Sequence, residues 1–402
     1  MAVLAVLTVG PAGNPAAAEE QRTPGTKSCS AVPMAKKSEK SRAATECIEF
    51  VTRDSTSARS VGAVDSPARA QNDETPGETC AVATEGEWSA TRKTVCLNGA
   101  QGIYTLYDST GKSIGTGLMD VYSSAVTTHV NTNIKEQITI TVTQLTGDVK
   151  SLNFKAGVNC KSTCKTTVRQ PWIGVKTLLQ GETVTGEVAY SSSVATDAED
   201  VFALEHSVLV TSSGATPEDA GMTWTTPDDR SIKCDGYSSS GYARGCVVNI
   251  PATLTFDVDD PENGGAIAVY KWVMGQRNSS WLTREGNDTI AKAHRDRTCG
   301  SFIYRPDLVP VKEECDEFPM AKTVEGGQAA MYCADVFPEK DASGNWGFRP
   351  VNNETWETME GKDCATVHVS QTVNGSLGGT YGNFVQVQRV QDQEKFKVEF
   401  SR

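Results

Sequence analysis

The densest group of residues that could do chemistry is a run of acids in the last third of the chain. It spans Glu313–Pro319 (EECDEFP) and is followed by Glu325–Gly327 (EGG). Neighbouring carboxylates repel one another, and a divalent cation held by oxygen ligands relieves that repulsion. The run therefore indicates a metal site. A charged turn ahead of a strand, stabilised by a bridge between Cys299 and Cys315, explains the same residues without a metal.

A second group is the glycine-rich segment Val373–Phe384 (VNGSLGGTYGNF). Its glycines allow close approach to the backbone, and Asn374 and Asn383 offer neutral oxygen donors. Such segments often only turn the chain. This one is not a phosphate-binding Walker sequence, because Gly-Lys-Ser/Thr is missing.

Histidine is scarce, so each His near the acids is a candidate proton acceptor. The chain has four, at positions 129, 206, 294 and 368. His129 and His206 lie in strand-like contexts and are interpreted as packed or surface residues. His294 and His368 are the candidate bases, because imidazole is the commonest general base near neutral pH.

Together these segments resemble the NucA/NucB family of secreted deoxyribonucleases. The likeness runs from about His294 to Phe400, about a quarter of the chain. Arg295, Arg297 and Cys299 resemble the arginine-rich approach to the family's acidic core. The matching segments are Cys315–Ala321, Glu325–Gly327, Asn374–Gly382, Arg389–Val390 and Phe396–Val398.

The resemblance implies a small α+β domain, similar in plan to the ββα-metal nucleases, that hydrolyses extracellular DNA with Mg²⁺ or Mn²⁺ and little sequence preference. Such a cation can activate water and absorb charge on the phosphoryl group. The predicted site residues are the catalytic Asp316, Glu317, His294 and His368, the substrate-binding Arg297 and Asn374, and the metal ligands Asp316, Glu317, Asn374 and Asn383.

Two positions depart from the family's pattern. Val373 stands where the family usually has an acid, and Gly375 stands where it usually has a basic residue. A catalytically inactive secreted relative that binds a partner or a cell-surface polymer is therefore an alternative. A second alternative is a nuclease toxin, whose N-terminal parts serve delivery and which an inhibitor or immunity protein would restrain.

The elements that must position these residues change in type along the chain. Short β-branched and aromatic runs recur between residues 88 and 260, and Ile138–Val142 alternates apolar with polar side chains, as in a half-buried strand. One or two helices are expected within 266–294, the second over Asp288–Arg295. A terminal strand is expected through Phe396, Val398 and Phe400.

These patterns predict a multidomain fold. The apolar run Ala2–Gly10 and the small residues Ala16–Ala18 indicate a signal peptide over 1–18, although a basic start is missing. Residues 19–85 are expected to be a disordered linker because they are poor in apolar residues. A β-sandwich-like domain is expected over 86–260, and the α+β nuclease-type domain over 263–402.

Composition places the protein outside the cell. The chain has 402 residues, a net charge of −12 and twelve cysteines, an even number that favours disulfides over metal-binding thiols. No stretch is long enough to span a bilayer, so we expect a secreted chain without a membrane anchor. A negative protein binds DNA only through local positive charge or a cation. The predicted disulfides are Cys80–Cys96, Cys160–Cys164, Cys234–Cys246, Cys299–Cys315 and Cys333–Cys364.

Overall fold

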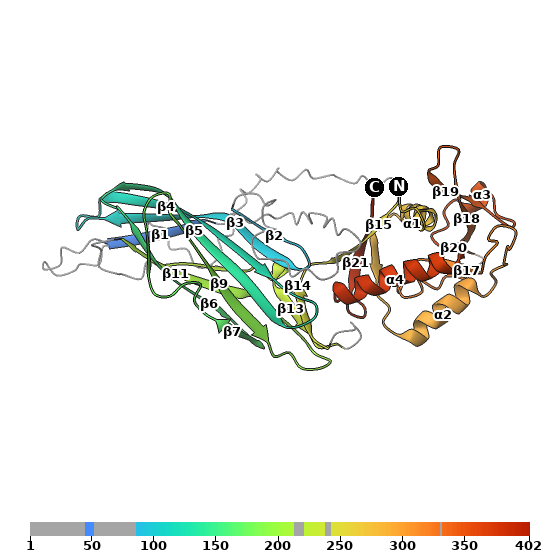
Figure 1. Ribbon diagram of the computed structural model, residues 1–402, viewed down its shortest axis with the longest axis horizontal. Coiled ribbons are helices and arrows are strands. Elements are labelled where there is room, and N and C mark those ends of the chain that lie inside the picture. The colour runs from blue at the N-terminus through green and yellow to red at the C-terminus, as the bar shows by residue number, and fades with distance from the viewer. Residues whose placement is uncertain (1–44, 52–85, 213–220, 238–242, 330–331) are drawn as a thin grey trace, which may run out of the picture.

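The chain folds around two separate hydrophobic cores. The computed structural model describes residues 45–51, 86–212, 221–237, 243–329 and 332–402. They are mostly β-strand with few helices, which confirms the predicted β-rich character. One core extends from Ile48 to Val248 and the other from Ala252 to Val398. We name the two bodies the β unit (45–248) and the C-terminal unit (252–402); Figure 1 shows them along the long axis of the molecule.

The larger sheet of the β unit has the strand order β1-β3-β4-β5-β9-β7, and β2 also pairs with β3. In β5, Ile138, Ile140 and Val142 are buried and the threonines between them are partly exposed, as the alternating sequence predicts. The strands are β1 (Thr45–Val51), β2 (Glu87–Ala90), β3 (Thr94–Tyr107), β4 (Ser113–Val126), β5 (Asn133–Gly147), β7 (Cys164–Val168) and β9 (Thr183–Ser192).

Two smaller sheets complete the β unit, in the orders β12-β11-β6-β8 and β10-β13-β14. The ring centroids of Phe50 on β1 and Trp224 on β12 lie 5.5 Å apart, so side chains of the two larger sheets share one core. The strands are β6 (Leu152–Cys160), β8 (Lys176–Leu178), β10 (Glu199–Phe202), β11 (Leu204–Ser212), β12 (Gly221–Thr225), β13 (Ile232–Asp235) and β14 (Gly245–Val248).

The C-terminal unit combines two sheets with helices, and Figure 1 shows α2 and α4 beside β17. The sheet orders are β15-β21-β16 and β17-β20-β18-β19. The strands are β15 (Ala252–Asp257), β16 (Trp281–Thr283), β17 (Glu313–Phe318), β18 (Ala334–Lys340), β19 (Trp346–Pro350), β20 (Ala365–Ser370) and β21 (Lys395–Ser401). The helices are α1 (Gly264–Gln276), α2 (Asp288–Cys299), α3 (Trp356–Met359) and α4 (Gln371–Val387).

The helices α1 and α2 and the strand β21 lie where the sequence predicts them, but two strands differ from expectation. Residues 45–51 fall in the expected linker, yet they form β1, because Ile48 and Phe50 are buried against β3 in the first core. β15 was expected in the middle domain. It pairs in parallel with β21 and contributes to the second core, so the units divide before residue 252. The other predictions for residues 1–85 lie outside the described residues.

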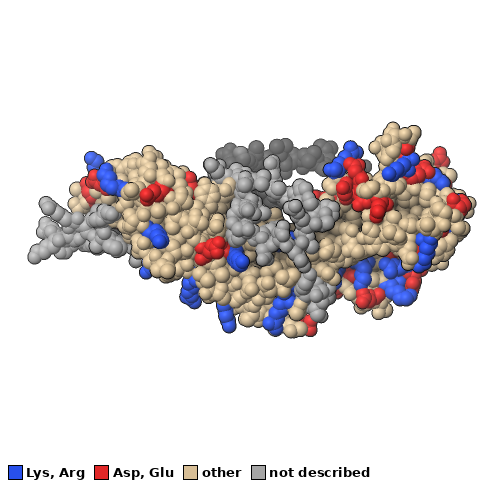
Figure 2. All heavy atoms as spheres, in the orientation of Figure 1, with Lys and Arg blue, Asp and Glu red and all other residues tan. Residues whose placement is uncertain are grey.

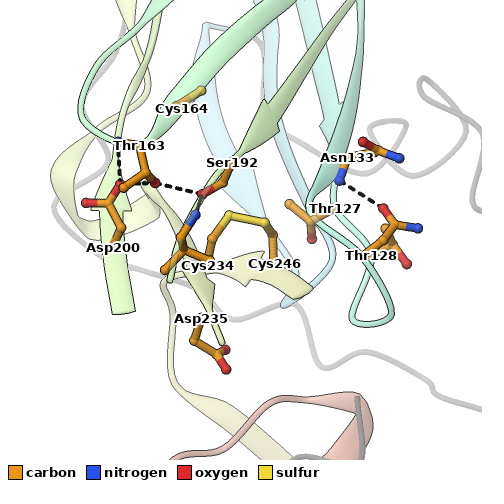
Figure 3. Close-up of a disulfide and its surroundings, with 12 residues drawn as sticks. Thr127, Thr128, Asn133, Thr163, Cys164, Ser192, Asp200, Cys234, Asp235 and Cys246 are labelled. Atoms are coloured by element: carbon orange, nitrogen blue, oxygen red, sulfur yellow. Dashed lines mark hydrogen bonds between the residues drawn. A yellow bond between two sulfur atoms is a disulfide. The ribbon is translucent and has the colours of Figure 1, made fainter. Parts of the chain in front are cut away.

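Four of the predicted disulfides are confirmed, namely Cys160–Cys164, Cys234–Cys246, Cys299–Cys315 and Cys333–Cys364. Cys80 lies outside the described residues, so its pairing with Cys96 stays a prediction. Cys234 and Cys246 face each other in register on β13 and β14 (Figure 3). Among the described residues, no helix has both the length and the apolar character that crossing a membrane requires.

Buried ion pairs join the two units. Arg389, which follows α4, is fully buried and places its Nη2 2.5 Å from Oδ1 of Asp235, also fully buried. Its Nη1 donates to the backbone oxygen of His129 at 2.8 Å. Arg92 and Lys233 of the β unit both pair with Glu394, each at 2.6 Å. Figure 3 shows Asp235 pointing toward the ribbon of the C-terminal unit.

Candidate active site

Asp316 lies on β17, an edge strand of the four-stranded sheet. Successive side chains of a strand point to opposite faces, so Asp316 and Glu317 meet different helices. Asp316 faces α1, where the Tyr270 hydroxyl donates to its Oδ2 at 2.6 Å. The Tyr270 ring stacks on Phe318 with centroids 4.2 Å apart, which fixes the position of the hydroxyl.

Glu317 faces α2. Asn287 caps this helix by accepting hydrogen bonds from the amides of Thr289 and Ile290. Arg295, two turns into the helix, donates from Nε to Oε1 of Glu317 at 3.2 Å. The Cys299–Cys315 disulfide links the end of α2 directly to β17. This hydrogen bond and the disulfide together hold α2 against β17 at Glu317.

The glycine-rich segment is helical rather than a loop. α4 begins at Gln371, where the Ser370 hydroxyl accepts from the amide of Val373. Asn374 lies in the first turn and donates from Nδ2 to Oε2 of Glu314 at 2.9 Å. Because β17 residues 314 and 316 share a face, this hydrogen bond brings Asn374 to the same side of the strand as Asp316.

These side chains line one cavity of about 160 Å³. This volume has room for an ion with several waters. It is too small to enclose a polymer, which would have to lie across the opening of the cavity. The lining residues are Tyr270, Arg295, Asp316, Glu317, Met320, Ala321, Lys322, Asn374, Leu377, Gly378 and Tyr381. The structure therefore brings together Asp316, Glu317 and Asn374, three of the four predicted metal ligands.

The environment of the two acids disfavours their charged forms. Burial raises the pKa of Asp316 to about 8; the hydrogen bond from Tyr270 opposes this shift, and the charge of Glu317 adds to it. Burial also raises the pKa of Glu317, although the Arg295 guanidinium opposes that shift. Two adjacent, buried carboxyl groups with raised pKa values are typical of a site that gains a cation or exchanges a proton.

The donor set fits a hard dication. Carboxylate and amide oxygens are the ligands that Mg²⁺ and Mn²⁺ prefer. Among the described residues, Oδ1 of Asp316 and Oδ1 of Asn374 accept no hydrogen bond, so both oxygens are available. Cys299, Cys315 and Glu317 also lie within 4.8 Å of one another, but both sulfurs belong to a disulfide and are not the thiolates that bind metals.

Two further residues predicted on the helices do not reach the cavity. Asn383 is exposed; it follows Asn374 by nine residues, which at about 100° per residue places it on the opposite side of α4. Arg297 donates from Nη1 to the backbone oxygen of Gly327 at 2.9 Å. It is about 200° around α2 from Arg295, which is the arginine that lines the cavity.

The two candidate bases also lie outside the cavity lining. His294 packs against Gly327 and places Nδ1 3.1 Å from the backbone oxygen of Ala321, so it contacts the back of the cavity wall. His368 is buried on β20 between Glu313 and Asp335, with nitrogen–oxygen distances of 2.5 and 2.8 Å. It joins three strands of the sheet.

The Glu325–Gly327 segment of the predicted motif supports the loop that follows β17. Glu325 accepts from the amide and the hydroxyl of Thr283 at 2.8 and 2.9 Å. Gly327 has a φ of +75°, and a Cβ on Gly326 would lie 2.4 Å from the backbone oxygen of Met320. Glycine is therefore required at both positions for the loop to adopt this conformation.

Sequence reasoning missed Tyr270, Lys322 and Tyr381 as cavity residues. Tyr270 lies in α1 among apolar residues, where its spacing indicates a core position. The Tyr381 hydroxyl donates to the backbone oxygen of Lys322 at 2.9 Å and joins α4 to the loop after β17. A helical reading of the glycine segment would have found Tyr381, because it lies two turns after Asn374 on the same face.

Comparison with known proteins does not assign the chain to a family. No protein-family model matches it, and no curated protein is detectably similar to it. The resemblance to the NucA/NucB family therefore stays a prediction.

Proposed function

We propose that the C-terminal unit is a metal-dependent deoxyribonuclease that hydrolyses DNA phosphodiester bonds with little sequence preference. The supporting observation is that Asp316, Glu317 and Asn374, from two distant segments, line one cavity, where Asp316 and Asn374 each have an oxygen that accepts no hydrogen bond from the described residues. The family resemblance of the same segments points to the same chemistry. Mg²⁺ or Mn²⁺ would be held by these three side chains.

The two acids, Tyr270 and Arg295 each have a role in this proposal. A bound dication would polarise the phosphoryl group and make water more acidic. Asp316 and Glu317 divide the roles of ligand and general base. Tyr270 orients Asp316, while Arg295, whose side chain is 63% exposed, can hold a phosphate through its planar guanidinium.

Local charge makes DNA binding compatible with a net charge of −12. Arg295 and Lys322 both line the cavity, where they pair with Glu317 and Asp288, and the proposed cation adds two positive charges there. Phosphate oxygens would therefore meet an attractive field at the site itself. We further infer that the enzyme acts in an oxidising compartment outside the cell, because four disulfides are formed among the described residues.

Plasmid cleavage by the full, oxidised chain tests the proposal. Supercoiled DNA is incubated with Mg²⁺ or Mn²⁺, with and without chelator, and the relaxed and linear forms are quantified. The substitutions Asp316→Asn and Glu317→Gln should each lower the rate by at least about a hundredfold, as loss of a catalytic carboxylate does. The conservative amides preserve volume, so folding is retained.

Matched controls use carboxylates of the same unit outside the cavity lining. Asp363→Asn and Glu357→Gln alter exposed residues and should cleave at the wild-type rate. The proposal is refuted if no divalent metal supports cleavage, or if both cavity variants retain the wild-type rate.

A second candidate function is metal-dependent binding without cleavage. It rests on Val373, which packs partly buried against the second core where the family has an acid. In that case the protein binds Mn²⁺ through Asp316 yet leaves plasmid intact. Measuring metal binding and cleavage on the same preparation separates the two functions.

A further inference from the structure

One part of the β unit has a charge opposite to that of the whole chain. Residues 149–181 contain six Lys and Arg and no Asp or Glu, a net charge of +6. Because the whole chain is at −12, the remaining residues sum to −18. The basic residues are Lys150, Lys155, Lys161, Lys165, Arg169 and Lys176, and all six are exposed.

These basic residues come from adjacent elements, β6, β7, β8 and their connections. β6 pairs with β8, and the amide of Val158 on β6 donates to the backbone oxygen of Arg169 after β7. Figure 2 shows Lys and Arg side chains projecting from the lower edge of the β unit, where Figure 1 places β6 and β7. The segment therefore presents one basic edge, which we name the β6–β8 edge (residues 149–181).

Most of this charge is not neutralised within the protein. Lys161 pairs with Glu205 at 2.7 Å. Lys155, Lys165, Arg169 and Lys176 form no ion pair with any other residue that the structure describes. Their charge is thus available to an external anion.

The same edge exposes aliphatic side chains. Ile173 is 92% exposed and Val175 is 58% exposed, and both lie in the connection between β7 and β8. The connection is anchored beside them, because Trp172 is buried and donates from Nε1 to the backbone oxygen of Phe154 at 3.2 Å. The exposed side chains are therefore presented to solvent by a fixed backbone.

We propose that the β6–β8 edge docks the protein onto an anionic phospholipid bilayer. Ile173 and Val175 enter the interfacial region, and Lys165, Arg169 and Lys176 contact lipid phosphates. Apolar insertion combined with basic contacts is the arrangement by which proteins lie on a membrane without spanning it. This inference concerns the β unit and is independent of the proposed nuclease.

A bilayer fits this edge better than a nucleic acid. Non-specific nucleic-acid grooves combine basic residues with exposed aromatic rings that stack on bases. The aromatic residues of the segment, Phe154 and Trp172, are both buried. An exposed isoleucine gains nothing from a phosphate backbone, whereas it gains free energy on entering lipid.

Vesicle flotation of the full chain tests the proposal. One set of vesicles is phosphatidylcholine alone and the other contains phosphatidylcholine with phosphatidylglycerol. We expect binding only to the anionic set, weakened by salt. Ile173→Ser with Val175→Ser should lower the partition coefficient by about tenfold or more. Lys165→Gln with Arg169→Gln should lower it by about tenfold or more.

Matched controls and a DNA arm make the result decisive. Val130→Ser and Lys112→Gln change exposed residues outside the edge and should leave the partition coefficient unchanged. All of these variants change exposed residues and should keep the wild-type melting temperature. The proposal fails if anionic vesicles do not bind the protein, or if the Ile173/Val175 variant binds them equally well. It also fails if a DNA duplex displaces the protein fully from anionic vesicles, and if its binding to that DNA depends on Lys165 and Arg169 but not on Ile173.

Discussion

Asp316 is the residue on which pH should act most visibly. Its pKa is about 8 in the folded chain against 3.8 for an ordinary aspartate. Between those values the unfolded chain has lost the proton that the folded chain keeps, so stability falls as pH rises. In chelator, the free energy of unfolding should decrease from about pH 4 to about pH 8, by up to about 1.4 kcal/mol per pH unit.

Asp316→Asn should weaken this dependence, leaving the part that comes from Glu317, and should stabilise the metal-free protein at pH 8, since the amide is neutral and can still accept from Tyr270. Urea unfolding of both proteins across the pH range measures the effect. Parallel curves for the two proteins would show that Asp316 is ionised at neutral pH and would contradict the account.

His368 should respond to pH in a way that separates structure from catalysis. Burial opposes its charge, but its hydrogen bonds to Asp335 and Glu313 raise its pKa above the usual 6.5. The resulting stabilisation is complete below the unfolded pKa and is lost as pH rises through the folded pKa. We expect His368→Gln to destabilise the protein strongly at pH 6 and less at higher pH.

The cleavage rate of folded His368→Gln should stay within about threefold of wild type, because His368 does not line the cavity. Asp363→Asn serves as the control for a polar change in the same unit. A loss of about a hundredfold in rate with unchanged stability would instead identify His368 as the base that the sequence suggested.

At the scale of elements, α4 contains four glycines whose cost should be measurable. A Cβ at Gly375, Gly378, Gly379 or Gly382 would meet nothing within 4 Å. Glycine in a helix interior is about 0.5–1 kcal/mol less stable than alanine. Gly379→Ala should therefore raise the free energy of unfolding by about that amount and leave cleavage unchanged.

Gly378→Ala is the informative partner of this variant, because Gly378 lines the cavity. It should stabilise the protein equally but reduce cleavage, since the added methyl group lies where a substrate would approach. Thermal unfolding and plasmid cleavage of both variants measure the difference. Equal cleavage by the two variants would show that α4 does not border the reacting groups.

Only part of the candidate site could be predicted from the sequence. Asp316 and Glu317 were predictable because they stand together in one short run. Asn374 was predictable from its place at the start of the glycine segment. The position of Asn383 could not be predicted, because four glycines argue against a helix. Only the helical geometry of α4 shows that Asn383 lies on the side away from the cavity. Arg295 and Arg297 were indistinguishable until the orientation of α2 was known.

At the scale of the whole molecule, the two units should unfold together. Arg389 and Asp235 are both fully buried, and 154 residues separate them, which is why no local pattern indicates the pair. In the sequence, Arg389 belongs to a stretch that resembles the ending of the nuclease family, whereas in the structure its side chain joins the β unit. Differential scanning calorimetry of the full chain should show one transition.

Removing one partner should break this coupling. Asp235→Asn leaves a buried guanidinium without its counter-charge, which costs about 3–5 kcal/mol. We expect a lower melting temperature and two separable transitions. Asp229→Asn, which changes an exposed carboxylate 3.1 Å from Arg230, is the matched control and should change little. An unchanged melting temperature in Asp235→Asn would contradict a structural role for the pair.

Calorimetric titration of Mn²⁺ into the full, oxidised chain tests the central claim most directly. One site should appear, with an affinity that increases with pH toward about 8 as Asp316 loses its proton. Binding should be lost in Asp316→Asn and retained in Asp363→Asn. The account is contradicted if no heat of binding is observed at any pH, or if Asp316→Asn binds Mn²⁺ as tightly as the wild type.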